Sequence, residues 1–316
     1  MSPARPWQRP WFAPLVALAA VYALFCALSP ETFARPEIVA TMARQTAVVA
    51  IVALGMTVII AQGGIDLSVG SGVALTTVVV AWLLKRGFGP LAASAGGVAA
   101  LGVSGLLTGL AVTRLRLTPF IVTLGAMSVL RGAAKGLAAE QTIVVESRGL
   151  EQLLAPAGGP ALLVPAGVWL ALALAAAVAA LLHYTRFGRY VYAVGSSEAT
   201  ARLAGVDVGR VRVASYLLAS LLTGVAGVVE FSKLTVGDPT DSAGLELAVI
   251  ASVVIGGASL AGGEGSVAGA LVGAFLMTVI KTGSTHLGLS NWVQEIVTGL
   301  IIVLAVALDR VRRARR

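Results

Sequence analysis

Ten apolar runs follow one another along this chain, and they restrict its fold more than any other feature. Each is close to the 20 or so residues that an α-helix needs to cross the hydrocarbon core of a bilayer. They cover residues 12–29, 45–62, 69–84, 91–112, 118–137, 161–182, 212–231, 247–261, 267–284 and 292–309. Glycine and serine interrupt the runs between 45 and 84 and between 247 and 284. The pattern predicts an all-α, polytopic membrane bundle of about ten transmembrane helices.

The composition excludes several other classes of protein. Only 12% of the residues are charged and 57% are hydrophobic, whereas soluble domains average about 25% and 45–50%. So little charge cannot cover the surface of a soluble domain, and so much hydrophobicity excludes a disordered chain. Cys26 is the only cysteine, which excludes an internal disulfide and any multi-cysteine metal site.

The positions of the basic residues predict how the chain is oriented in the membrane. The net charge is +8, yet the lysines and arginines flank apolar runs, and five of the 23 lie in the last seven positions. This is the bias of cytoplasmic loops, so we expect no nucleic-acid partner. Both termini are predicted to be cytoplasmic, with residues 1–11 and 310–316 as tails and 183–211 as the longest cytoplasmic loop.

The first run resembles a signal peptide, because Arg5 and Arg9 precede it. It is longer than the usual apolar region of such a peptide, and many further runs follow. We therefore expect an uncleaved first helix, so that residues 1–316 form a single transmembrane domain in a multi-pass protein of the lipid bilayer.

A break separates the second and third runs. Gly63 and Gly64 interrupt the helical pattern, and Asp66 and Ser68 follow directly. An acid facing lipid at the bilayer centre costs about 2.5–3.5 kcal/mol, so Asp66 must face protein, water or the interface. One interpretation makes Asp66 the N-cap of the next helix, accepting backbone N–H bonds from Ser68 and Val69. The other places the unwound segment on a translocation pathway. The two can coexist.

Residues 253–270 form a second interruption that loosely resembles the first. A Gly-Gly pair again ends an apolar run, and a turn rich in glycine and serine opens the next. Paired interruptions in the two halves of a transporter point to a site between repeats. Small residues also simply allow helices to approach closely, and the sequence leaves both interpretations open.

The loop 183–211 contains a short predicted helix. Ser197 can cap its N-terminus, Glu198 suits its first turn, and Gly205 suits its C-terminal end. About two turns are too few to be stable alone in water, so this helix must pack on something. Ala199, Leu203 and Val206 offer a small apolar side. The alternative to a docking helix is a surface helix that lies on lipid headgroups.

Four segments together resemble the signature segments of sugar-type ABC importer permeases, the membrane subunits of ribose, xylose and galactose uptake systems. They are Gly55–Gly72, Thr118–Gly132, Thr185–Val206 and Glu246–Gly273, and the resemblance extends from about residue 45 to Asp309. It implies ATP-driven alternating access that carries a monosaccharide from a periplasmic binding protein to the cytoplasm, across the bacterial inner membrane. The implied partners are a cytoplasmic ABC ATPase, the periplasmic sugar-binding protein and a second copy of the permease.

The resemblance also implies roles for particular residues. The ATPase-coupling helix would carry Glu198, Ala199, Arg202, Leu203 and Gly205. The translocation pathway would include Gly63, Gly64, Asp66, Ser68, Pro119 and Phe120. Ser197, Ala248 and Glu264 depart from the family pattern, where Asn, an acid and a basic residue are usual, and these departures put the identity of the sugar in doubt.

No cofactor is expected in this chain. A P-loop requires Gly-Lys followed by Ser or Thr, and no Gly-Lys pair occurs, so ATP and Mg²⁺ would be bound by the partner ATPase. We therefore expect a transport subunit and not an enzyme. The alternative function is an ion-coupled secondary transporter of a small polar solute, for which Asp66 would be the one candidate for a buried acid.

Overall fold

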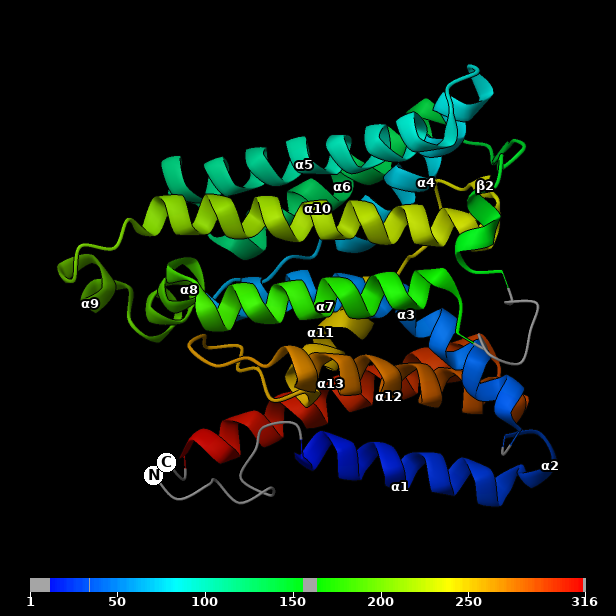
Figure 1. The fold of residues 1–316 in the computed structure, drawn as a ribbon. Helices are drawn as coiled ribbons and strands as arrows, with labels where there is room; N and C mark the ends of the chain where they lie inside the picture. The colour runs from blue at the N-terminus through cyan, green and yellow to red at the C-terminus, as the bar shows by residue number, and fades with distance from the viewer. Residues whose placement is uncertain (1–11, 34, 156–163, 315–316) are drawn as a thin grey trace.

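The computed structural model describes residues 12–33, 35–155 and 164–314, and its fold is all-α (Figure 1). Within these residues the helices are α1 (Phe12–Leu28), α2 (Pro30–Phe33), α3 (Pro36–Ala61), α4 (Val69–Lys85), α5 (Pro90–Arg114), α6 (Pro119–Leu137), α7 (Ala166–Tyr184), α8 (Arg186–Ser196), α9 (Glu198–Leu203), α10 (Val208–Leu234), α11 (Leu245–Ile255), α12 (Val267–His286) and α13 (Asn291–Ala314). A 3₁₀ helix, η2 (Leu150–Leu153), and two short antiparallel strands, β1 (Ile143–Val144) and β2 (Val236–Gly237), lie in the longer connections.

Each predicted run contains one helix, which confirms a polytopic helical membrane protein. In the described residues six helices are long and apolar enough to span a bilayer, namely α3, α5, α6, α7, α10 and α12. The apolar parts of α1, α4, α11 and α13 are shorter, so the number of about ten crossings stays a prediction.

Several predicted boundaries were wrong, and three of them are instructive. α3 begins at Pro36, nine residues before the run at 45–62, because Pro36 and Glu37 form a good first turn before the apolar stretch. α11 ends at Ile255, well before residue 261, because Gly257 has a positive φ of 93° and breaks the helix. α13 continues through Ala314, so the predicted tail 310–316 is helical as far as it is described. Residues 1–11 and 161–163, parts of two predicted segments, lie outside the described residues.

The C-terminal end of the described chain lies at the end of the bundle that carries α8 and α9. Figure 1 shows the last turn of α13 there, while α1 begins nearer the middle and runs away from that end toward α2. That the termini and the loop 183–211 share one side of the membrane, and that this side is cytoplasmic, stay predictions.

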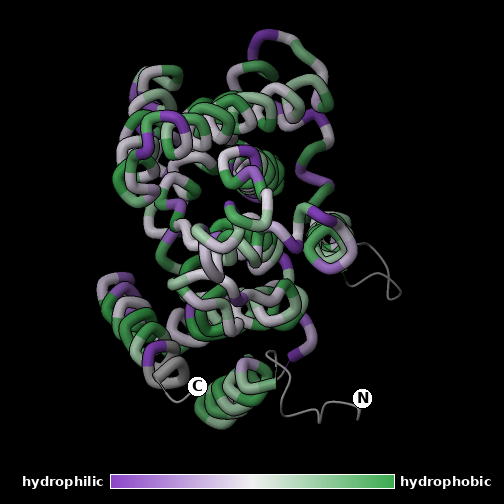
Figure 2. Tube along the Cα trace, turned by 90° about the vertical axis from the view of Figure 1, so that its left-hand side faces the viewer, coloured by the Kyte–Doolittle hydropathy of each residue, from purple (hydrophilic) through white to green (hydrophobic). Residues whose placement is uncertain are grey.

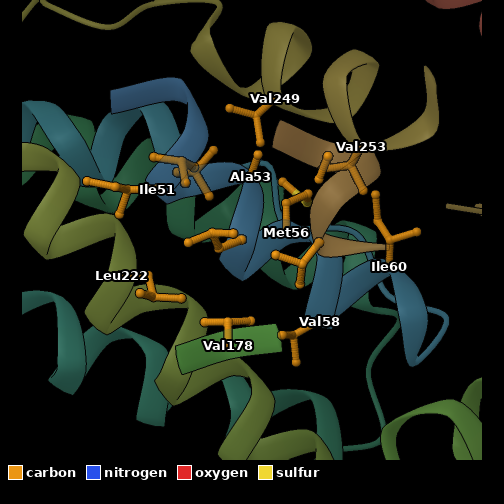
Figure 3. Packing of buried hydrophobic residues seen from close by; sticks show 14 of the residues in the cluster. Ile51, Ala53, Met56, Val58, Ile60, Val178, Leu222, Val249 and Val253 are labelled. Carbon is orange, nitrogen blue, oxygen red and sulfur yellow. The ribbon is translucent and has the colours of Figure 1, made fainter. Parts of the chain in front are cut away.

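Helix α3 is the centre of the bundle. Residues 46–61 are all buried except for the partly buried Val49, because the sequence is apolar on every face of the helix. Figure 3 shows Ile51, Ala53 and Met56 of α3 between Val249 of α11 and Leu222 of α10. A helix of this kind can only be covered by other helices, and α7, α10, α11 and α12 surround it.

The outer helices, by contrast, expose apolar side chains. Leu107, Ile121, Leu172 and Leu300 are all exposed, each on a different helix. Figure 2 looks along the bundle from the α8–α9 end, and hydrophobic (green) segments lie along its outer edge. Exposed apolar surface on this scale is what lipid contact requires.

Glycines bring α5 and α10 into backbone contact. A Cβ on Gly105 would lie 2.6 Å from the carbonyl oxygen of Tyr216, and one on Gly109 would lie 2.9 Å from the Cα of Val213. Small residues four apart allow helices in membranes to approach this closely, which increases van der Waals contact along the pair. The α5–α10 contact therefore depends on the missing side chains.

We predict that Gly105→Ala destabilises the protein. Overpacking of a tight contact costs about 1–3 kcal/mol, which exceeds the gain of about 1 kcal/mol in helix propensity. The measurement is thermal unfolding in detergent, with Gly299→Ala on α13 as the matched control, because a Cβ there meets nothing within 4 Å. A melting temperature of Gly105→Ala equal to that of the control would contradict the argument.

Candidate functional site

The short helix predicted in the loop 183–211 is present as α9, with the predicted caps. The Oγ of Ser197 accepts a hydrogen bond from the backbone N–H of Thr200 at 3.3 Å. At the other end, Gly205 has a φ of 80°, and its N–H donates to the carbonyl of Arg202 while that of Val206 donates to the carbonyl of Ala201, both at 3.0 Å. These paired bonds satisfy the last carbonyls of the helix. Local capping chemistry alone was enough to place α9.

The apolar residues of α9 do not all pack in the same direction. Ala201 is buried and joins the core, and Val206 packs against it. Ala199 is exposed, and Leu203 is 90% exposed. The sequence assigned Ala199 and Leu203 to one apolar side with Val206, and the structure directs these two away from the chain.

Glu198 holds α9 to the start of α10. Its carboxylate forms ion pairs with Arg202 of α9 and with Arg212 of α10, each at 2.7 Å. The hydrogen bonds from Arg202 and the charge of Arg212 lower the pKa of this carboxyl, against the opposing effect of its partial burial. Arg212 was missed from sequence, because its contact depends on the angle between α9 and α10.

Helix α8 was also missed, since the sequence analysis treated residues 186–196 as loop. Thr185 caps it by accepting a hydrogen bond from the N–H of Gly188 at 3.3 Å. The signals were present in this cap and in an amphipathic pattern that buries Val191 and Val194. Only Ser197 separates α8 from α9, so the two helices form one continuous unit.

The break between α3 and α4 is a buried polar segment. Asp66 is only 2% exposed, and it accepts hydrogen bonds from the N–H of Ser68 at 2.8 Å and from its hydroxyl at 2.6 Å. The predicted bond from the N–H of Ser68 is thus present, whereas the predicted cap position was wrong, because the N-cap of α4 is Ser68 and not Asp66. Asp66 instead stabilises the extended turn before the helix, a role that Asp plays in Asx turns.

The start of α6, which carries the predicted pathway residues Pro119 and Phe120, is bonded to this break. The hydroxyl of Thr123, in the first turns of α6, donates to the carbonyl of Ile65 at 3.2 Å. Pro119 and Phe120 open the same helix, and Phe120 is half exposed. Gly63 is exposed, whereas Gly64, Asp66 and Ser68 are buried.

The second interruption lies between α11 and α12, at residues 256–266. A Cβ on Gly269 would overlap the carbonyl oxygen of Gly256, so here the small residues do allow a close helix approach. The interruption also contacts the first one, because the N–H of Gly263 donates to the carbonyl of Ala61 at 2.9 Å. The two glycine-rich segments, almost 200 residues apart in sequence, therefore share one end of the bundle.

The N-termini of α4 and α11 meet. A Cβ on Gly70, the second residue of α4, would overlap the carboxylate of Glu246, the second residue of α11. A carboxylate placed between two helix N-termini is stabilised by both helix dipoles. Glu246 was missed from sequence, although an acid in the first turn of an apolar run was a visible signal.

Comparison with known proteins identifies the family to which this chain is similar. The profile of the family described as branched-chain amino acid transport system / permease component matches residues 38–306. The ribose import permease of Escherichia coli strain K12 is 38% identical over 296 residues, which are 93% of this chain and 92% of that protein.

Two further relatives are named for other sugars. The L-arabinose ABC transporter permease of Azospirillum brasilense is 33% identical over 320 residues, 100% of this chain and 94% of the relative. The D-allose transport system permease of E. coli K12 is 33% identical over 294 residues, 93% of this chain and 89% of the relative. No solved structure matches the chain.

The fold defines a multi-pass helical membrane protein with a capped, exposed helix at one end. The chain belongs to the membrane permease family of ABC importers, among the permeases of sugar uptake systems. Permeases of this family are transport components and not enzymes, and the family implies an ATPase and a periplasmic binding protein as partners.

Proposed function

We propose that this permease carries a monosaccharide related to ribose, arabinose or allose from a periplasmic binding protein into the cytoplasm. Two copies would form the transmembrane pathway in the bacterial inner membrane. A separate cytoplasmic ATPase would bind ATP and Mg²⁺ and drive alternating access. The relatives named for ribose, arabinose and allose support a sugar of this class.

One observation carries the coupling part of this proposal, namely the exposure of α9. A helix of six residues is too short to be stable alone, yet α9 is capped at both ends and held by Glu198 and Arg212. The side chains of Ala199 and Leu203 on this helix are exposed and point away from the rest of the described chain. Such a helix suits a groove on a partner protein.

The pathway is proposed to pass the break at 62–68 and the first turns of α6. Unwound backbone at membrane depth occurs where protein or a water-filled cavity surrounds it. The bond from Thr123 to Ile65 fixes the two segments to each other, and Gly63 and Phe120 are both exposed. Asp66 would hold the shape of the segment through Ser68.

The test is reconstitution of the permease in proteoliposomes with its cognate ATPase and binding protein. We expect uptake of at least one of ribose, arabinose and allose that requires ATP on the ATPase side and continues when a protonophore removes the proton gradient. The purified permease alone should hydrolyse no ATP. Uptake without the ATPase, driven by an ion gradient, would support the secondary-transporter alternative and contradict this proposal.

A further inference from the structure

The last turn of α8 lies against both interruptions of the helical bundle. A Cβ on Gly195 would overlap the carbonyl oxygen of Ala61 and lie 2.6 Å from the amide nitrogen of Gly263. A Cβ on Gly262 would lie 2.7 Å from the carbonyl oxygen of Gly195 and 3.0 Å from the Cα of Gly63. We call this contact of three backbone segments, at residues 61–63, 195–196 and 262–263, the glycine junction.

Hydrogen bonds hold the junction together. The N–H of Gly263 donates to the carbonyl of Ala61 at 2.9 Å, which joins the end of α3 to the α11–α12 connection. The hydroxyl of Tyr192, one turn before Gly195 on α8, donates to the carbonyl of Gly265 at 2.9 Å. Thus α8 is fixed to the second interruption by a side chain and to the first by direct backbone packing.

No flexible linker separates the glycine junction from α9. α8 ends at Ser196, and Ser197 already caps α9, so the exposed helix follows the junction by two residues. Contacts between backbones cannot be relieved by a change of side-chain rotamer, and closely packed interiors transmit displacements. A movement of α9 must therefore move the turns at 61–63 and 262–263, or break the contacts at Gly195.

We propose that Gly195 is a positioning residue that transmits movement of α9 to both interrupted helix pairs, α3–α4 and α11–α12. This inference rests on the proposed function, in which α9 contacts the ATPase. It assigns the transmission of that contact to one backbone junction. Glycine is required at position 195 because any side chain would separate α8 from Ala61 and Gly263.

The test compares Gly195→Ala with Gly209→Ala in the full complex of permease, ATPase and binding protein. Gly209 lies in the first turn of α10, near the same end of the bundle, and a Cβ there would make an ordinary contact of 3.4 Å with Asp207. We expect Gly195→Ala to assemble with the ATPase and keep its basal ATP hydrolysis. Stimulation of hydrolysis by sugar-loaded binding protein, and sugar uptake, should fall about tenfold, within the usual range of coupling between sites. The control should match the wild type.

Tyr192→Phe provides a second variant that removes only one hydroxyl. It should fold normally. The rate of stimulated ATP hydrolysis should fall about threefold to fivefold, since one hydrogen bond contributes about 1 kcal/mol. If Gly195→Ala fails to fold, this variant decides the question. Normal stimulation and uptake in Tyr192→Phe, or in a folded Gly195→Ala, would overturn the inference, as would loss of ATPase assembly in either variant. A wild-type complex without ATP-driven uptake would instead overturn the proposed function.

Discussion

Replacing Leu203 by aspartate is expected to abolish sugar uptake while the permease stays folded in the membrane. Leu203 is 90% exposed, so it contributes almost nothing to the core of its own chain. Burying a leucine in a partner contributes about 1.5–3 kcal/mol, and an aspartate there would bury an unpaired charge at a higher cost. The ATPase should therefore fail to dock on the permease, and ATP hydrolysis would then no longer drive sugar uptake.

Two measurements check this prediction. Co-purification of the ATPase with the permease in detergent should fall at least about tenfold, since a loss of about 1.4 kcal/mol already produces that change. Uptake in vesicles should be absent at a normal membrane level of the permease.

The matched control is Leu91→Asp. Leu91 is 86% exposed and lies at the start of α5, at the end of the bundle opposite α9. The Leu91→Asp variant should still co-purify with the ATPase. Full uptake by Leu203→Asp would refute the assignment of α9 as the docking helix.

The features that could be predicted from sequence are those fixed by local chemistry. Apolar runs of about 20 residues located a helix in every case, because the hydrophobic pattern does not depend on tertiary contacts. Ser197 and Gly205 bounded α9 correctly, because capping bonds form between residues close in sequence. The same reasoning was half right at Asp66, which accepts the predicted N–H bond from Ser68, whereas the N-cap position of α4 is Ser68 itself.

The features that were missed depend on contacts between distant segments. Nothing local shows that Glu246 meets Gly70, that Arg212 meets Glu198, or that Gly195 lies against Ala61 and Gly263. A glycine in a sequence reads equally well as a turn, a flexible point or a packing site, and only the neighbouring backbone decides. The candidate site was therefore predicted as separate pieces, and their arrangement came from the fold.

Reversing the charge of Glu198 is the second change expected to abolish transport. Each of its ion pairs is partly exposed, so each contributes only about 0.2–1 kcal/mol. A lysine at this position would replace two attractions with repulsion from Arg202 and Arg212. Because α9 is marginal by itself, this change should release it from α10, and uptake should be lost while membrane insertion remains normal.

A charge swap separates two explanations of that loss. If Glu198 acts by holding α9 on α10, the double variant Glu198→Lys/Arg212→Glu should recover part of the uptake, because the pair between the helices is restored with its charges exchanged. If Glu198 contacts the ATPase directly, the double variant should stay inactive. Arg212→Ala should reduce uptake more than Arg210→Ala, since Arg210 is exposed and pairs with Asp207 in its own turn, whereas Arg212 pairs with Glu198 of α9. Equal effects of these two alanine variants, with full uptake by Glu198→Lys, would show that the position of α9 does not depend on this carboxylate.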